Sequence, residues 1–276
     1  MTDGPPAASE IAPAKLNLAL HVRGKLPDGR HAIETIFAFC TDGDRLTVEG
    51  QSLDEGLSLS VTGPFAAELP AEGDNLVLRA AHALADAAGP GKGAALTLDK
   101  RLPVASGIGG GSADAAAALR LLTSLWRIDP KHAEAVAPAL GSDVPACLLS
   151  LPARGTGAGD ELTPVAVPEL SGAPVLLVNP RVALSTAEVF AAWDGQDRGP
   201  LLDWRDGKND LEDAAIGLVP QIGTVLAWLS AQAGASFVRM SGSGATCFAL
   251  FQSEEERDSA ADGVPREWWR LATFLR

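Results

Sequence analysis

The sequence predicts an α+β fold in two domains, and three observations support this. Short stretches that alternate apolar and polar residues, such as 57–62, predict half-buried strands. Longer stretches with apolar residues every three or four positions, such as 75–88 and 112–126, predict amphipathic helices. The elements do not follow a strict strand–helix–strand rhythm, and the 276 residues exceed the length of about 150 expected for one domain.

The first half of the chain is expected to contain both strands and helices. Strands are expected at 11–22, 32–40, 45–49, 57–62 and 94–98, and helices at 75–88, 112–126 and 130–140. Leu26-Pro27-Asp28-Gly29 is a turn signal, and Asp42-Gly43-Asp44 is expected to separate two strands. Gly89-Pro90 ends the first helix, since neither residue continues one well.

The amino-acid composition changes after residue 150, where glycine and proline become frequent. We therefore expect domains at 1–153 and 154–276. In the second domain, strands are expected at 175–178, 237–240 and 246–251, and helices at 185–193, 211–232 (interrupted near Pro220) and 254–262.

Composition argues against several classes of protein. The formal net charge of −13 disfavours binding to nucleic acid or to an anionic membrane. The three cysteines lack CxxC spacing, so neither a disulfide framework nor a metal site is expected. The chain shows neither a secretory leader nor a run of about 18 apolar residues. We expect a cytoplasmic protein with a small-molecule partner, and the sequence leaves its oligomeric state open.

A glycine-rich loop is the most informative segment. It comprises Pro103, Val104, Ala105, Ser106, Gly107, Ile108, Gly109, Gly110, Gly111, Ser112 and Ala113. It lies between a predicted strand and an alanine-rich helix, so glycine amides and the positive end of that helix would face one ligand. This combination suits phosphate groups. The loop matches neither Walker A nor the dinucleotide GxGxxG pattern, and the alternative is a flexible linker.

Three further segments carry candidate functional residues. Lys15 interrupts an apolar strand, which is costly unless the ammonium is paired; the alternative is an exposed strand face. Asp143 lies in Gly141-Ser142-Asp143-Val144-Pro145, where a turn or helix-capping role is the alternative. Met240 to Thr246 contains a second glycine turn with Gly242 and Ser243, for which a simple hairpin is the alternative.

Taken together, the four segments resemble the GHMP kinase superfamily. The strings that carry the resemblance are APAKLNLALHV, LPDGRHAIETIFAF, DNLVLRAA, RLPVASGIGGGSADAA, GSDVP, KNDLE and MSGSGATCFALF. The resemblance implies two α+β domains with the active site in the cleft between them. AKLNL together with DGRH points to the member that phosphorylates the 2-hydroxyl of a cytidine-diphosphate sugar alcohol in non-mevalonate isoprenoid biosynthesis.

The resemblance also implies roles for individual residues. Asp143 would accept the hydroxyl proton, and Lys15 would stabilise the developing negative charge. The loop from Pro103 to Ala113 would hold ATP, with Mg²⁺ neutralising its phosphates. No acidic pair in the sequence indicates a metal site, and whether Mg²⁺ has a direct protein ligand stays open. Gly242 and Ser243 would lie near the substrate phosphates.

Recognition of the cytidine half would fall on Asn17, His31 and Phe190, with His31 at the cytosine edge. For His31 the alternative is a satisfied turn histidine. The family usually has tyrosine before this histidine, whereas this chain has Arg30 there and no tyrosine at all. We predict that the Arg30 guanidinium stacks on the base opposite Phe190.

Two rival functions stay open from sequence alone. One is another GHMP kinase, acting on homoserine or mevalonate, which the DGRH turn disfavours. The other is a non-catalytic, ligand-binding relative, which would be expected to have lost Lys15 or Asp143. Both residues are present.

Overall fold

The computed structural model describes residues 8–48, 56–69 and 75–276, and these separate into two compact units. Unit 1 contains the described parts of Met1–Ala14, Asp42–Val104 and Gly110–Leu149. Unit 2 contains Lys15–Thr41, Ala105–Gly109 and Ser150–Arg276. The units are therefore discontinuous, and the boundary predicted near residue 153 lies close to only one of the places where the chain passes from one unit to the other.

Two long strands supply residues to both units. β1 (Ala8–Lys25) and β2 (His31–Val48) each contain 18 residues and are joined by the turn predicted at 26–29. The break predicted at Asp42-Gly43-Asp44 was wrong, because β2 continues through it. In unit 1, a side chain at Gly43 would overlap the carbonyl oxygen of Ala12, so this glycine serves close strand packing and not a turn.

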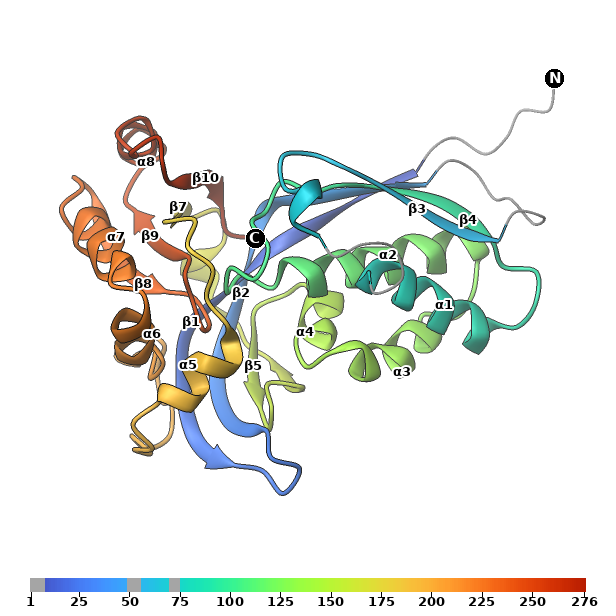
Figure 1. Cartoon of the computed structure of the whole chain (residues 1–276), viewed down its shortest axis with the longest axis horizontal. Coiled ribbons are helices and arrows are strands. Elements are labelled where there is room, and N and C mark those ends of the chain that lie inside the picture. Colours follow the sequence, from blue (N-terminus) through green and yellow to red (C-terminus); the bar gives the residue numbers. More distant parts are fainter. Residues whose placement is uncertain (1–7, 49–55, 70–74) are drawn as a thin grey trace. The chain divides into compact units, whose positions relative to one another are not determined.

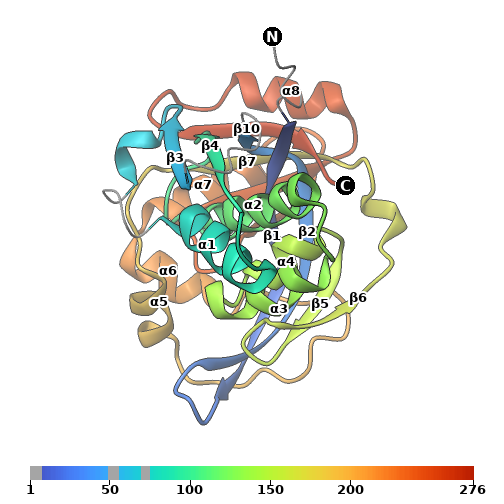
Figure 2. The ribbon, with the colours of Figure 1, turned by 90° about the vertical axis from the view of Figure 1, so that its right-hand side faces the viewer.

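Unit 1 packs four helices beside a small sheet (Figure 1; Figure 2). β3 (Leu57–Thr62) runs parallel to β4 (Ala94–Asp99), which pairs antiparallel with the end of β2. The helices are α1 (Leu76–Ala88), α2 (Gly110–Trp126), α3 (Lys131–Leu140) and α4 (Val144–Leu149), and a short 3-10 helix, η1, covers Ala66–Glu68. Their apolar faces meet the strands in one core, which includes Leu84, Leu96 and Leu119.

Unit 2 contains a four-stranded antiparallel sheet in the order β10-β7-β9-β8. Its strands are β7 (Pro174–Asn179), β8 (Ala235–Met240), β9 (Cys247–Phe251) and β10 (Trp269–Phe274). Helices α6 (Glu212–Leu218), α7 (Gln221–Ser230) and α8 (Glu254–Asp262) pack on this sheet through one apolar cluster (Figure 1). β5 (Ala153–Thr156) pairs with the first half of β2 and with β6 (Glu161–Pro164). The remaining elements are η2 (Pro168–Leu170) and α5 (Thr186–Ala192).

The sequence predicted most helices correctly and missed short elements. The predicted helix at 254–262 is α8 with the same bounds. α1 begins one residue after its predicted start, because Asn75 caps the helix: its side chain accepts a 2.9 Å hydrogen bond from Val77 N–H. α4, β5, β6 and β10 were not predicted, because none of these short segments shows the regular apolar alternation over six residues that marks β3. The predicted strand at 45–49 extends to Glu49, which lies outside the described residues.

The described residues also bear on three other expectations. Cys40, Cys147 and Cys247 are all buried, as small apolar side chains usually are. Within the described ranges, no helix is long and apolar enough to cross a membrane. In the same ranges, no three His, Cys, Asp or Glu side chains gather in a way that could hold a metal ion.

Candidate active site

The glycine-rich loop is divided between the units, and residues 105–109 belong to unit 2. Gly107 has a left-handed φ of +78°, which side chains rarely adopt. A Cβ at Gly107 would lie 2.5 Å from the carbonyl oxygen of Ser241. The Ser241 hydroxyl donates a 3.0 Å hydrogen bond to the Gly107 carbonyl, and Lys15 N–H donates to Ile108 at 2.9 Å. The protein itself therefore requires glycine at 107 and fixes this half of the loop.

The other half of the loop opens α2 in unit 1. The helix begins at Gly110, two residues before the predicted start at Ser112. No protein atom lies within 4 Å of a Cβ placed at Gly111, so packing does not require glycine there. The first N–H groups of a helix lack intrahelical acceptors and lie at its positive end. The bare backbone at Gly111 thus leaves room for an anion at this terminus.

Lys15 is buried in unit 2, so the alternative of an exposed strand face was wrong. Its side chain is 3% exposed, and Nζ donates a 2.9 Å hydrogen bond to Asn17 Oδ1. The Asn17 amide nitrogen donates to Thr35 Oγ1 at 2.8 Å, and its backbone N–H donates to Ser241 Oγ at 3.1 Å. Asn17, predicted to bind substrate, therefore also orients the Lys15 ammonium.

Asp143 lies in unit 1, directly before α4. Its backbone carbonyl accepts a 3.0 Å hydrogen bond from Cys147 N–H, the first bond of the helix. This bond uses only the main chain, so it does not test the side-chain capping role considered from the sequence, and it is compatible with chemistry at the half-buried carboxylate. Lys15 belongs to unit 2 and Asp143 to unit 1. That these two side chains flank one hydroxyl therefore stays a prediction.

The second glycine turn closes the β8–β9 hairpin, as its alternative reading expected. Ser241 N–H donates to the Thr246 carbonyl at 2.9 Å. A Cβ at Gly242, where φ is +56°, would lie 2.8 Å from the carbonyl oxygen of Gly107. The Ser243 hydroxyl is 2.8 Å from that of Thr186 at the start of α5. The hairpin turn and the glycine-rich loop thus pack directly against each other within unit 2.

Three aromatic rings meet near the start of β2. The His31 ring stacks on Phe190, with centroids 4.6 Å apart and planes inclined by 22°. Trp193 approaches His31 edge-on at 5.9 Å. Burial, together with the charge of Lys25, lowers the pKa of His31 below its usual 6.5. The imidazole is therefore neutral at pH 7 and offers one donor and one acceptor.

Arg30 is held by two carboxylates. Its guanidinium donates to Asp28 at 2.8 Å and to Asp160 at 3.1 Å, and the side chain is 52% exposed. Hydrogen bonds to Asp28 and Asp160 raise the pKa of Arg30 above its usual value. The structure thus brings His31 and Phe190 together and places the Arg30 guanidinium against acidic groups, with its predicted stacking role untested.

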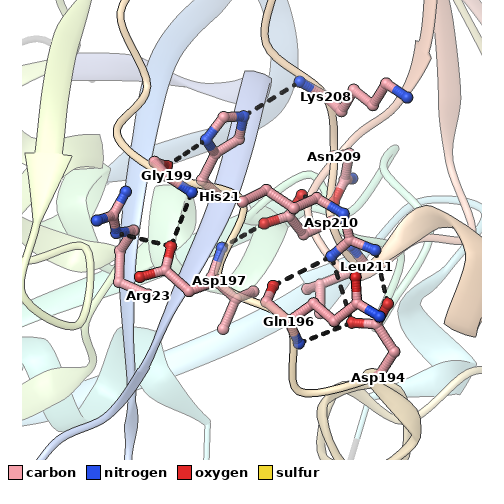
Figure 3. Close-up of polar contacts among 12 residues, drawn as sticks. His21, Arg23, Asp194, Gln196, Asp197, Gly199, Lys208, Asn209, Asp210 and Leu211 are labelled. Carbon is pink, nitrogen blue, oxygen red and sulfur yellow. Dashed lines mark hydrogen bonds and ion pairs between the residues drawn. The ribbon is translucent and has the colours of Figure 1, made fainter.

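Polar contacts join the segment after α5 to β1 (Figure 3). His21 Nδ1 lies 2.9 Å from the carbonyl oxygen of Gly199, and Arg23 forms a 3.3 Å ion pair with Asp197. The buried Asp210 carboxylate accepts a 2.8 Å hydrogen bond from Val22 N–H. These contacts hold the chain that follows Phe190 and Trp193.

Asn209 lies in KNDLE, one of the strings that carry the resemblance, but the sequence predicted no role for it. Its amide donates to the carbonyl oxygens of Met240 at 2.9 Å and Gly242 at 2.7 Å, so it supports the hairpin turn. Thr35 and Ser241 were missed as partners of Asn17. Polar residues within otherwise apolar strands were the available signal, but the sequence does not reveal their partners.

Comparisons with known proteins agree with this architecture. Residues 75–150 match the GHMP kinases N terminal domain, and residues 194–271 match GHMP kinases C terminal. The chain is 52% identical to a 4-diphosphocytidyl-2-C-methyl-D-erythritol kinase of Rhizorhabdus wittichii, over 97% of this chain and 94% of that protein. It is 48% identical to the enzyme of that name from Novosphingobium aromaticivorans, over 97% of this chain and 92% of the relative.

Two solved structures of kinases are also similar to this chain. A crystal structure of 4-(cytidine 5'-diphospho)-2C-methyl-D-erythritol kinase matches with a TM-score of 0.83 and 33% identity, over 97% of this chain and 99% of that chain. A homoserine kinase from Cytophaga hutchinsonii matches with a TM-score of 0.72, over 100% of this chain and 96% of that one. At 16% identity, the latter likeness shows the fold alone.

The fold and the two matched domains define this chain as a GHMP kinase, an ATP-dependent kinase of small molecules. This confirms the predicted α+β architecture and the superfamily resemblance. Within that superfamily the chain belongs to the 4-diphosphocytidyl-2-C-methyl-D-erythritol kinases, because it is about half identical to them over nearly its whole length.

Proposed function

We propose that this kinase transfers the γ-phosphoryl group of ATP to the 2-hydroxyl of 4-diphosphocytidyl-2-C-methyl-D-erythritol, a step of non-mevalonate isoprenoid biosynthesis. The observation that carries the proposal is 52% identity over 97% of the chain to a relative of that name. The buried cysteines and the charge of −13 support a cytoplasmic enzyme that acts on a small molecule and not on nucleic acid.

In the proposed reaction, the substrate hydroxyl oxygen attacks the γ-phosphorus, and the bond between that phosphorus and the ADP oxygen breaks. Asp143 accepts the hydroxyl proton. The Lys15 ammonium stabilises the negative charge that develops on the attacking oxygen. The hydrogen bond from Lys15 to Asn17 supports this role, because it holds the ammonium in one orientation.

The glycine-rich loop from Pro103 to Ala113 holds the ATP phosphates in this proposal. Support comes from the open backbone at Gly111 and from the helix terminus that begins at Gly110. Among the described residues there is no cluster suited to a metal ion, and the buried carboxylates of Asp44 and Asp114 both bind Lys100. Mg²⁺ therefore enters the proposal only as a counter-ion of the ATP phosphates, and no step is assigned to it.

The cytidine half is assigned to the aromatic group around His31. A neutral imidazole has the donor and acceptor needed to meet the amide edge of cytosine. Phe190 offers a flat apolar face at the same place, and Asn17 on β1 donates to Thr35, which lies four residues after His31 on β2. Gly242 and Ser243 are assigned to the substrate phosphates, since their turn packs on the glycine-rich loop.

We expect Arg30→Ala to raise the KM for the cytidylyl substrate about 3- to 10-fold, because it removes the guanidinium predicted to stack on the π face of the base. Steady-state kinetics at saturating ATP would measure this KM. Arg205→Ala is the matched control: its side chain is 51% exposed, pairs with Glu169 at 2.5 Å and has no assigned role. An unchanged KM in Arg30→Ala would refute the stacking role.

The function itself is tested by ATP consumption with purified protein and a panel of acceptors. The panel contains the cytidylyl sugar alcohol, mevalonate and homoserine. The proposal expects turnover of the cytidylyl substrate alone, with competition by free CDP. Turnover of mevalonate or homoserine, or of none of the three, would contradict it.

A further inference from the structure

A buried charged triad lies at the two ends of the glycine-rich loop, and the proposed mechanism makes no use of it. Lys100 directly follows β4, Asp44 lies in β2, and Asp114 lies in the first turns of α2, all within unit 1. Lys100 Nζ donates to Asp44 Oδ2 and to Asp114 Oδ2, each at 2.6 Å. The side chains are 1%, 0% and 3% exposed, respectively.

The triad is joined to the loop at both ends. Asp44 Oδ1 accepts hydrogen bonds from the backbone N–H groups of Arg101 at 2.5 Å and Leu102 at 2.8 Å, immediately before the loop. Asp114 directly follows the loop and belongs to the helix that the loop opens. A Cβ at Gly110 would lie 3.1 Å from Lys100 Nζ. The triad therefore determines how far apart the beginning and the end of the loop are held.

The charges of the triad do not balance if every group is ionised. One ammonium would face two carboxylates, and the site would carry an uncompensated buried negative charge next to a loop that must bind an anion. Asp44 receives three donors, from Arg101, Leu102 and Lys100. Asp114 receives one, and no hydrogen-bond partner reaches its buried Oδ1.

A proton on Asp114 resolves this imbalance. The carboxyl groups of Asp114 and Asp44 each lie 2.6 Å from the same Lys100 ammonium, and a proton on one of them relieves their mutual repulsion. Burial and the neighbouring Asp44 raise the pKa of Asp114 to about 8, although Lys100 opposes this. The two carboxylates raise the pKa of Lys100 against the effect of burial, so the ammonium stays charged.

We propose that Lys100, Asp44 and Asp114 are positioning residues for ATP, and that they work as a neutral triad in which Asp114 carries a proton. This inference rests on the proposed binding of ATP by the glycine-rich loop. Loss of that proton would add a negative charge next to the phosphate-binding backbone. ATP binding would then weaken as the pH rises through about 8.

Other charged groups nearby are already engaged elsewhere. The Arg101 side chain pairs with Asp99 at 2.7 Å, and Arg120, further along α2, pairs with Glu10 at 2.7 Å. Lys100 and Asp44 are the charged groups that act on Asp114. The pH response should therefore disappear when Asp114 alone is made unable to titrate.

The test is the KM and Kd for ATP of the full chain between about pH 6.5 and 9.5, with saturating cytidylyl substrate for the KM. In the unmodified protein, both constants should rise on the order of tenfold above pH 8, with a smaller change in kcat, because one added charge nearby is worth about that factor. In Asp114→Asn the rise should be absent, since the amide can accept from Lys100 at Oδ1 and does not titrate in this range.

Asp99→Asn is the matched control, because it removes the same formal charge one residue before Lys100 and should keep the rise of the unmodified protein. A flat pH profile in the unmodified protein would overturn the inference, and so would an equal rise in Asp114→Asn. If the unmodified protein binds no ATP at any pH, the proposed function fails instead.

The stability of Asp114→Asn provides a second readout. The native state retains a proton that the unfolded chain releases near pH 3.8, so the stability contributed by this group is lost as the pH rises from there to about 8. Asparagine has no such loss. The thermal midpoint at pH 8 should therefore not fall, and a fall of many degrees would contradict the protonated state.

Discussion

Replacement of Lys15 by Met, or of Asp143 by Asn, is expected to lower kcat by about 10²–10⁴-fold, the usual contribution of a positioned general acid–base group. Lys15 lies buried beside Asn17, so methionine removes the charge while it fills similar space. Asparagine at Asp143 leaves the backbone hydrogen bond to Cys147 in place. Steady-state kinetics with the cytidylyl substrate, together with thermal melts, would measure the effect.

The double variant tests whether the two groups act on one hydroxyl. The effects of substitutions at residues that act as one unit are strongly non-additive. The double variant Lys15→Met with Asp143→Asn should therefore lower kcat little more than the more damaging single change. Lys131→Met is the control, because Lys131 is an exposed residue at the start of α3. Turnover within about threefold of the unmodified protein in either single variant would remove that residue from the proposed chemistry.

Gly107→Ala is expected to lower the free energy of unfolding by about 2–5 kcal/mol, the sum of left-handed backbone strain and overpacking. The residue has a φ of +78°, and a Cβ would meet the carbonyl oxygens of Ser241 at 2.5 Å and Gly244 at 2.6 Å. All three neighbouring atoms are backbone, so they cannot move aside as a flexible side chain would. Urea denaturation measures the loss directly.

Gly111→Ala separates folding from ligand binding in the same loop. No protein atom would meet its Cβ, and alanine favours a helix by up to about 1 kcal/mol over glycine. Stability should therefore be kept, while the Kd for ATP rises about tenfold or more as the methyl group enters the space kept for phosphate. Equal loss of stability in both variants would contradict this division of the loop.

Local patterns predicted the elements that depend on near neighbours in the chain. The bounds of α8 and the start of α1 follow from a helical period and a capping residue, both readable within about ten residues. The glycine-rich loop before an alanine-rich helix likewise predicted an anion site. Short β5, β6 and β10 have no such signal, because each is defined by its partner strand.

The candidate site was predicted less completely than the fold. The pairing of His31 with Phe190 brings together residues 159 positions apart, yet both had been assigned to the same base through the resemblance. Arg30 was assigned from its place in the DGRH motif, where the family usually has tyrosine, and from its chemistry; nothing in the sequence indicated that Asp160 would hold it. Asn17 was expected at the substrate, but only the structure shows its bond to Lys15.

By itself, the sequence determined the class of fold, the position of the glycine-rich loop before its helix and the superfamily, because each follows from residue type and order along short segments. Tertiary structure alone decided which polar groups are buried together, as in the Lys100 triad and the contact of Gly107 with Ser241. The physical reason is that the free energy of a buried charge depends on its partner, and these partners come from distant parts of the chain.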